Sequence, residues 1–226
     1  PDKLYNNYGF LEYKLKSLHA IVVELNGLFI THLNGLGGHD PFIMYLKDNI
    51  LSLSASSELV EKINDKETVY KVDNILSRLS YEKETGYYLY SSDLPWATNL
   101  IKDPNPVISI EVKESISSFY ILNGYVDFNK QSLYRNNARA KKIKIFDKET
   151  NSIVGEYSLI DKVIYQLIML PNSVKHFEIR IIESYPGNKY SDLCISSIYL
   201  NKTNDKLLSG NYGISFYNEL KKDKKF

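Results

Sequence analysis

The feature that most constrains the fold is a period-two alternation of apolar and polar residues between Pro106 and Leu200. It is clearest in Ile108–Val112, Ile143–Ile145 and Phe177–Ile181. Because successive side chains of a strand point to opposite faces, alternation buries one face and wets the other, as in antiparallel sheets packed as a sandwich. Short turns separate these runs. We therefore predict a mainly β protein with an antiparallel, jelly-roll-like β-sandwich over residues 48–203.

Residues 1–47 are predicted to form a β-hairpin extension that packs on this sandwich. The β-rich runs Ala20–Leu25 and Leu28–Leu33 are joined by Asn26–Gly27. Asn-Gly tolerates the positive φ angles of a type I′ turn, so the sequence favours a hairpin here. The alternating run Phe10–Lys16 predicts a third strand.

One or two short helices are expected, and the best candidate lies around residues 57–66. A serine N-cap precedes Glu58, and apolar residues recur at helical spacing as far as Leu79. The β-branched residues of Thr68–Val72 could break such a helix. Residues 204–226 are predicted to be a C-terminal extension with a lysine-rich tail.

Charge and cysteine content exclude several classes of protein. Among 226 residues, 28 Lys and Arg balance 27 Asp and Glu, and the net charge of +1 argues against nucleic-acid or membrane-surface binding by the chain as a whole. No apolar run approaches the roughly 20 residues of a transmembrane helix. Cys194 is the single cysteine, so no internal disulfide exists, and we expect it to be a small buried apolar residue. The chain begins at Pro1, so we expect that a signal peptide or lipid anchor has been removed.

No catalytic or metal-binding motif stands out. The four histidines are scattered, and His39–Asp40 is the one close pair of a histidine and an acid, which is not a triad. HExxH, CxxC and DxDxDG motifs are absent from the sequence. We therefore predict that the protein is not an enzyme and needs no cofactor. Loop carbonyls could still hold a structural calcium ion.

Six segments resemble, in order, the motifs of one family. They are Ser54–Leu59 (SASSEL), Asp93–Asn99 (DLPWATN), Phe119–Tyr125 (FYILNGY), Asn136–Ile145 (NNARAKKIKI), Leu159–Leu170 (LIDKVIYQLIML) and Tyr185–Ile198 (YPGNKYSDLCISSI). Residues from about 52 to 200 thereby resemble the NADase-type glycan-binding domain, a bacterial branch of the galactose-binding-like, or discoidin-like, β-sandwiches. The chain departs from the family at Ser197, where an acid is usual, and after Trp96, where NLIKDPNP replaces a glycine-rich segment.

The resemblance implies a non-catalytic carbohydrate-binding module of a bacterial cell-envelope or secreted protein. Its partner would be a glycan or cell-wall polysaccharide, and its location extracytoplasmic: periplasm, envelope or secreted. The alternative is a protein–protein adaptor or adhesin that uses the same sandwich. The ligand residues expected on the end loops are Trp96, Tyr87, Tyr88, Asp93, Asn137, Arg139, Lys189 and Asp192.

Trp96 allows two interpretations. It lies in a polar segment with Asp93, close in sequence to Tyr87 and Tyr88. A flat exposed ring would stack on the C–H face of a sugar while nearby polar groups bind its hydroxyls. A buried ring would instead close the end of the sandwich.

The polar residues of the last two motifs are equally ambiguous. Asn137 and Arg139, at the start of a predicted strand, would either present a donor fork to a ligand or fix a neighbouring loop through Asp161 or Asp192. Lys189 and Asp192, in a turn-like segment, would either contact the ligand or pair with each other.

The segment from Lys130 to Lys148 is rich in basic residues. Its one acid is Asp147, and its seven basic residues give it a local charge of about +6: Lys130, Arg135, Arg139, Lys141, Lys142, Lys144 and Lys148. The run predicts either a patch for an anionic polymer or a solvated strand face that discourages aggregation.

Overall fold

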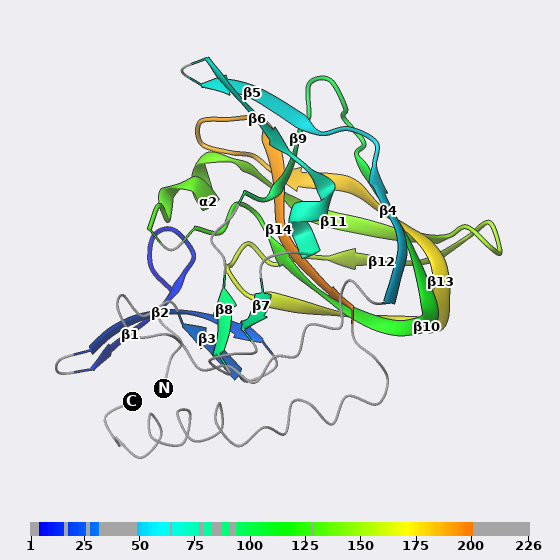
Figure 1. Ribbon diagram of the computed structural model, residues 1–226, viewed down its shortest axis with the longest axis horizontal. Helices are drawn as coiled ribbons and strands as arrows, with labels where there is room; N and C mark the ends of the chain where they lie inside the picture. The colour runs from blue at the N-terminus through cyan, green and yellow to red at the C-terminus, as the bar shows by residue number, and fades with distance from the viewer. Residues whose placement is uncertain are drawn as a thin grey trace.

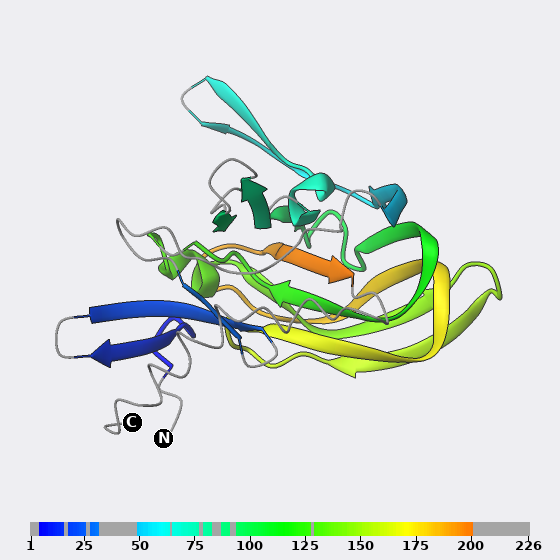
Figure 2. The same ribbon diagram turned by 60° about the horizontal axis from the view of Figure 1, so that its bottom comes forward.

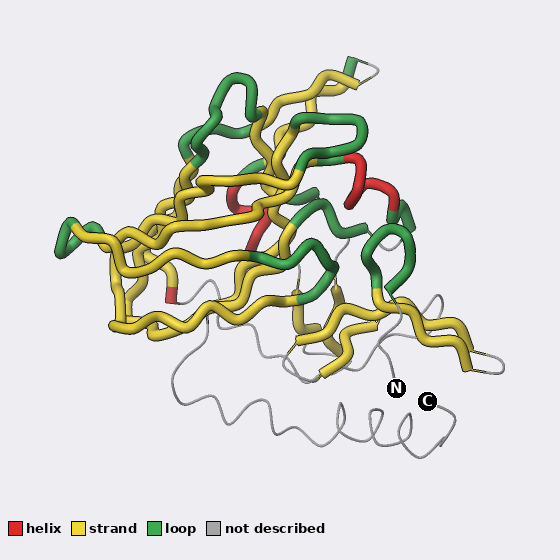
Figure 3. Tube along the Cα trace, turned by 180° about the vertical axis from the view of Figure 1, so that it is seen from behind, coloured by secondary structure: helices red, strands yellow, loops and turns green. Residues whose placement is uncertain are grey.

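The computed structural model describes residues 5–15, 18–25, 28–31, 49–63, 65–76, 79–82, 87–90, 94–127 and 129–200. Strands dominate this part of the chain (Figure 1; Figure 3), which confirms the prediction of a mainly β protein. The tail at 204–226 and the pair His39–Asp40 lie outside the described residues. No helix in the described part is long and apolar enough to cross a membrane.

The elements follow one another in this order: β1 (Leu11–Leu15), β2 (Leu18–Leu25), β3 (Leu28–Thr31), β4 (Ile50–Ala55), β5 (Leu59–Ile63), β6 (Lys66–Tyr70), the 3-10 helix η1 (Val72–Leu76), β7 (Leu79–Glu82), β8 (Tyr87–Tyr90), β9 (Trp96–Asn99), β10 (Val107–Asn123), α2 (Ser132–Asn136), β11 (Ala138–Asp147), β12 (Ser152–Ser158), β13 (Tyr165–Tyr185) and β14 (Asp192–Leu200).

Two long strands, β10 and β13, run through both layers of the sandwich. Val107–Glu111 pairs with His176–Arg180, and Ser118–Leu122 pairs with Tyr165–Met169, with irregular register between the two paired stretches. Such irregularities bend a strand, and β10 and β13 both bend sharply at one end of the molecule (Figure 2). Their outer halves extend a sheet in the order β12-β11-β13-β10-β4, and their other halves continue through β14 to β9.

The alternating residues of these strands meet in the core. Ile108 and Ile110 on β10 and Ile179 on β13 are fully buried, while the polar residues between them face outward. The stacked rings of Phe119 and Phe177, with centroids 6.0 Å apart, join the two long strands across the interior. Period two in the sequence therefore marks the sandwich interior, as predicted.

The N-terminal region contains the predicted hairpin and third strand. β1 pairs with β2 and β2 with β3, all antiparallel, and the β2–β3 register ends at Leu25↔Leu28. Asn26 and Gly27 lie outside the described residues. Phe10, directly before β1, is fully buried in the sandwich core, and its ring meets that of Tyr134 edge-on at 6.3 Å. The domain boundary at residues 47–48 stays a prediction.

The helix predicted around residues 57–66 was wrong, because the segment forms the protruding hairpin β5–β6 (Figure 2). Its β-branched residues pair across the hairpin, as in Val60↔Val69, and such residues favour strands over helices. Asp65, in the turn, has a φ of 64°, which ends any helix. The short helices lie elsewhere, at η1 and α2.

We expect Gly124→Ala to destabilise the fold by more than about 2 kcal/mol, because it combines a left-handed backbone with a steric clash. Gly124 has a φ of 82°, and a Cβ there would lie 2.5 Å from the Tyr134 ring and 2.8 Å from Arg139 Cγ. Urea unfolding would measure the loss, with Ser115→Ala at an exposed position of β10, the strand that ends directly before Gly124, as control. Equal stability of the two variants would contradict this packing.

Candidate functional site

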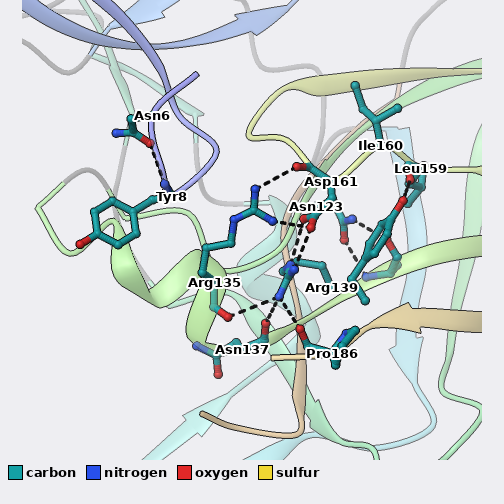
Figure 4. A network of polar contacts seen from close by, with 12 residues as sticks. Asn6, Tyr8, Asn123, Arg135, Asn137, Arg139, Leu159, Ile160, Asp161 and Pro186 are labelled. Carbon is teal, nitrogen blue, oxygen red and sulfur yellow. Dashed lines mark hydrogen bonds and ion pairs between the residues drawn. The ribbon is translucent and has the colours of Figure 1, made fainter. Parts of the chain in front are cut away.

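At the α2 end of the sandwich, one carboxylate holds two arginines (Figure 4). Arg139 donates from Nε to Asp161 Oδ1 at 3.1 Å and from Nη2 to Oδ2 at 2.9 Å. Arg135, the last basic residue of α2, binds the same Oδ2 through Nη1. Asp161 lies between β12 and β13, so this network ties three parts of the chain together.

Arg139 has little capacity left for a ligand. Its Nη1 donates to the carbonyl oxygens of Asn137 at 2.7 Å and Pro186 at 2.9 Å, and its side chain is only 4% exposed. Asn137 is also buried, and its Nδ2 donates to Leu133 O at 2.9 Å, which closes the end of α2. Of the two interpretations of this motif, the structure shows the loop-fixing one, with Asp161 as the partner.

The network also sets the charge of its members. Partial burial alone would raise the pKa of Asp161, but hydrogen bonds and charge from Arg139, with the charge of Arg135, hold that pKa below its usual value. The Tyr134 ring lies 5.4 Å from the guanidinium carbon of each arginine. Burial, and then the Asp161 charge, raise the pKa of Tyr134. Asp161 is therefore ionised and Tyr134 neutral at pH 7.

Next to this network lies an open groove of about 520 Å³. It is lined by side chains that carry amides, hydroxyls and one amine, and no acid is among them: Asn6, Asn7, Tyr8, Asn129, Lys130, Gln131 and Ser132. We call it the amide groove. Asn6 and Tyr8, on the loop before β1, stand opposite α2 in Figure 4.

Both walls of the amide groove are fixed by local hydrogen bonds. Asn6 Oδ1 accepts from the backbone N–H groups of Tyr8 at 3.0 Å and Phe10 at 3.1 Å, and Asn6 Nδ2 donates to Gln131 Oε1 at 2.6 Å. On the other wall, Asp127 Oδ1 accepts from the backbone N–H groups of residues 129 and 130 at 2.8 and 3.0 Å. These turns are Asx turns, which order a loop without secondary structure.

Trp96 does not lie on the surface. It is fully buried on β9, and its Nε1 donates to Ser57 O at 3.0 Å. This burial contradicts a sugar-stacking role, because the ring has no exposed face. The chemistry of indole explains the outcome: a large apolar ring fills the core, and its N–H is satisfied by a backbone carbonyl.

Lys189 and Asp192 have different surroundings and do not form an ion pair with each other. Lys189 is exposed, with Nζ 5.2 Å from the ring centroid of Tyr190. Asp192 is half-buried, and it accepts from Asn99 Nδ2 at 3.0 Å, while burial raises its pKa. Neither makes an ion pair with the other, so the predicted pairing is not observed. Their role as ligand contacts stays a prediction.

The remaining predicted residues are only partly placed. Tyr87 and Tyr88 lie on β8, which pairs with β7. Asp93 lies outside the described residues. Cys194 is buried beside Tyr70 and Ala97, as predicted for a small apolar residue.

The basic run does not form an unpaired patch. Lys141 and Lys142 both bind Glu183, at 2.9 and 2.8 Å, and their hydrogen bonds lower the pKa of Glu183 to about 2. Lys144 binds Glu156 at 2.8 Å. Cross-strand partners on β12 and β13 thus offset part of the charge of a run that looks uniformly positive in the sequence. Among the described residues no cluster of three or more His, Cys, Asp or Glu could hold a metal ion.

Sequence reasoning missed the amide groove. Its walls come from two stretches, 6–8 and 129–132, that are more than a hundred residues apart and match no motif. The available signal was compositional: the asparagine-rich run Asn6–Asn7–Tyr8 and the segment Asn129–Ser132 are both polar and turn-like. Only the fold brings them together.

Substituting Asp161 by Asn is expected to cost about 3 kcal/mol of unfolding free energy at pH 7, since Arg139 would stay buried without its counter-ion. The native carboxylate has a lowered pKa, so it stabilises the fold above the unfolded-state value of about 3.9 and loses this effect as the pH falls through its lower folded-state pKa. The variant should therefore lose less stability than the wild type between pH 5 and 2. Urea unfolding across this range tests both points. Glu156→Gln, in an exposed pair, should change little, and an identical acid dependence of Asp161→Asn and wild type would contradict the assignment.

Comparison with known proteins agrees with the motifs. Residues 107–201, from β10 to the end of β14, match the family model described as NAD glycohydrolase translocation F5/8 type C domain. No curated protein matches the chain.

Several solved structures of carbohydrate-binding modules are similar. A family 32 module of NanJ from Clostridium perfringens, in complex with galactose, is 12% identical, with a TM-score of 0.44 over 67% of this chain and 97% of that one. CpGH89CBM32-5 from Clostridium perfringens, in complex with GalNAc-β-1,3-galactose, is 12% identical, with a TM-score of 0.43 over 67% and 94%. The family 32 module of EndoD from Streptococcus pneumoniae is 8% identical, with a TM-score of 0.44 over 69% and 99%.

The family match covers four of the six sequence motifs and begins after the first two, at residues 54–59 and 93–99. Within it lie the Asn-Gly-Tyr strand end, the arginine strand and the Tyr-Pro-Gly turn. Residues 107–201 are therefore similar to the discoidin-like domain that this family model describes.

Proposed function

We propose that this protein is a non-catalytic carbohydrate-binding module whose ligand lies in the amide groove. The observation that carries the proposal is the lining of the groove: the amides of Asn7 and Asn129 beside an exposed tyrosine ring, on walls that the hydrogen bond between Asn6 and Gln131 joins. An amide both donates and accepts hydrogen bonds, as a sugar hydroxyl does, so an array of amides fits a polyol. Tyr8 is 43% exposed, and its ring can pack against the C–H face of a sugar.

The fixed loops of the groove support the same proposal. Binding to an ordered wall costs less conformational entropy than binding to a mobile one. Gly9, next to Tyr8, has a φ of 90°, and a Cβ there would press against Arg135 and Tyr134 at 3.2 Å. The loop before β1 is thus seated directly on the arginine network.

The charges near the groove favour binding over catalysis. Asp161 is the carboxylate at the centre of the network, and two guanidinium groups occupy it and keep it ionised. A general acid or base needs a pKa near the working pH and access to the substrate, and Asp161 has neither. We infer that the network supports the groove and does not react with its ligand.

A glycan ligand places the module outside the cytoplasm, in the periplasm, at the envelope or in a secreted protein, where polysaccharides are displayed. The family description links such domains to the translocation of an NAD glycohydrolase. For this chain, attachment to a surface glycan is the contribution that the amide groove can supply.

We expect glycan binding to be lost in Tyr8→Ala and retained in Tyr190→Ala. The two tyrosines are matched, at 43% and 40% exposure, but Tyr190 lies in the turn with Lys189. A glycan array on the purified chain, followed by calorimetry with the best ligand, measures the effect. Loss of a stacked ring should weaken binding at least tenfold.

The reverse result would move the site. Binding lost in Tyr190→Ala and in Lys189→Ala, but kept in Tyr8→Ala, would assign the ligand to the Tyr185–Asp192 turn. A folded protein that binds no glycan on the array would favour the adaptor function, and a pull-down from envelope extract would then seek its protein partner.

A further inference from the structure

A second groove, of about 550 Å³, lies on the outer face of the sheet β12-β11-β13-β10-β4. We call it the sheet groove. Its lining comes from β4, the start of β10, the middle of β13 and the segments that flank β4, β10 and β11: Ser54, Ala55, Ser56, Asn105, Val107, Ser109, Lys148, Glu178, Arg180, Ile181 and Ile182. None of these residues lines the amide groove.

Arg180 is held in place but keeps one free donor. Its guanidinium carbon lies 3.8 Å from the ring centroid of Phe146. Glu178 Oε2 accepts from Nε at 2.8 Å and pairs with Nη2 at 2.7 Å. Nη1 has no hydrogen-bond partner among the described residues, and the side chain is 38% exposed. A guanidinium fixed in this way presents its free N–H groups to the groove at little further entropic cost.

The sheet groove carries surplus positive charge. Lys148 Nζ lies 3.4 Å from Glu178 Oε1, so two cations share the one carboxylate of the lining. Partial burial opposes ionisation of Glu178, but Arg180 and Lys148 outweigh it and hold the pKa of Glu178 below its usual value. The carboxylate stays charged at neutral pH, and one positive charge remains uncompensated in the groove.

Outside the groove, acids offset most of the positive charge of this sheet. Lys144 pairs with Glu156 at 2.8 Å, while Lys141 and Lys142 share Glu183 at 2.9 and 2.8 Å. A polyanion that needs a broad positive surface, such as a nucleic acid, finds no such surface here. A single oxyanion group next to hydroxyls fits better, because Ser54 and Asn105 line the groove with polar groups suited to neutral hydroxyls.

We propose that the sheet groove binds an acidic polysaccharide through one carboxylate or sulfate group. Arg180 Nη1 and Lys148 Nζ receive the oxyanion, and Ser54 and Asn105 bind hydroxyls of the same sugar. This site is separate from the amide groove and does not depend on glycan binding there.

Calorimetry with size-defined oligogalacturonate and heparin fragments, and with neutral dextran as the uncharged control, tests the site. We expect Arg180→Gln to weaken binding of the acidic oligomers about tenfold, since a charge-assisted hydrogen bond is lost. Lys148→Gln should weaken it less, and Glu178→Gln should strengthen it, because the competing carboxylate is removed. Lys144→Gln, the matched charge change on the same face outside the groove, and Tyr8→Ala should each leave it within twofold.

Three results would overturn the proposal. Equal losses in Arg180→Gln and Lys144→Gln would show diffuse electrostatics instead of a site. A loss in Glu178→Gln would show that this carboxylate itself contacts the ligand. Free sulfate that binds as tightly as the oligomers would assign the groove to small anions. Circular dichroism and thermal unfolding of each variant verify the fold, and Lys148→Gln, at an exposed position, decides the matter if Arg180→Gln does not fold.

Discussion

The ion cluster of Asp161 with Arg135 and Arg139 is the interaction on which the α2 end of the molecule depends. It links the helix α2, the start of β11 and the connection between β12 and β13, and through Arg139 it also holds the Pro186 turn. A buried guanidinium is tolerated only when its donors are satisfied, and here one carboxylate and three carbonyl oxygens do so. The polar surface groups nearby can then vary, because they do not hold the scaffold.

The two grooves differ in how they present polar groups. The amide groove has neutral donors and acceptors on loops that local turns keep ordered. The sheet groove has charged groups on strands, where the ladder fixes their spacing. A loop site adapts to the shape of a ligand, whereas a strand site offers a constant spacing of charges. The two sites that we propose are thus different kinds of recognition surface.

Much of the fold could be predicted from the sequence, because the buried residues of a sandwich strand are apolar at every second position. Ile108, Ile110 and Ile179 are examples. The hairpin β2–β3 could be predicted because an Asn-Gly pair separates two β-rich runs in the sequence. The conformation of the segment that begins at Leu59 could not be predicted, because a short amphipathic stretch fits both the helical and the strand period. The pairing with Lys66–Tyr70, further along the chain, decides for the strand.

The candidate site was much less accessible. Motifs identified Arg139 and Asn137 as important but could not show that the Arg139 guanidinium and the Asn137 Nδ2 group donate within the protein. Trp96 illustrates the same limit, since an indole in a polar segment can face either way, and the available space decides. The amide groove depends on contact between Asn6 and Gln131, 125 residues apart, which no local pattern encodes.

The bent strands β10 and β13 determine how the sandwich unfolds. Each belongs to both layers, so neither layer can detach while the other persists, and the sandwich must open as one cooperative unit. Tension applied through a ligand in the sheet groove therefore loads these two strands, which carry Ser109, Glu178 and Arg180. A module that anchors one body to another gains from this continuity, because its mechanical strength is that of the backbone ladder and not of the contact between two separate sheets.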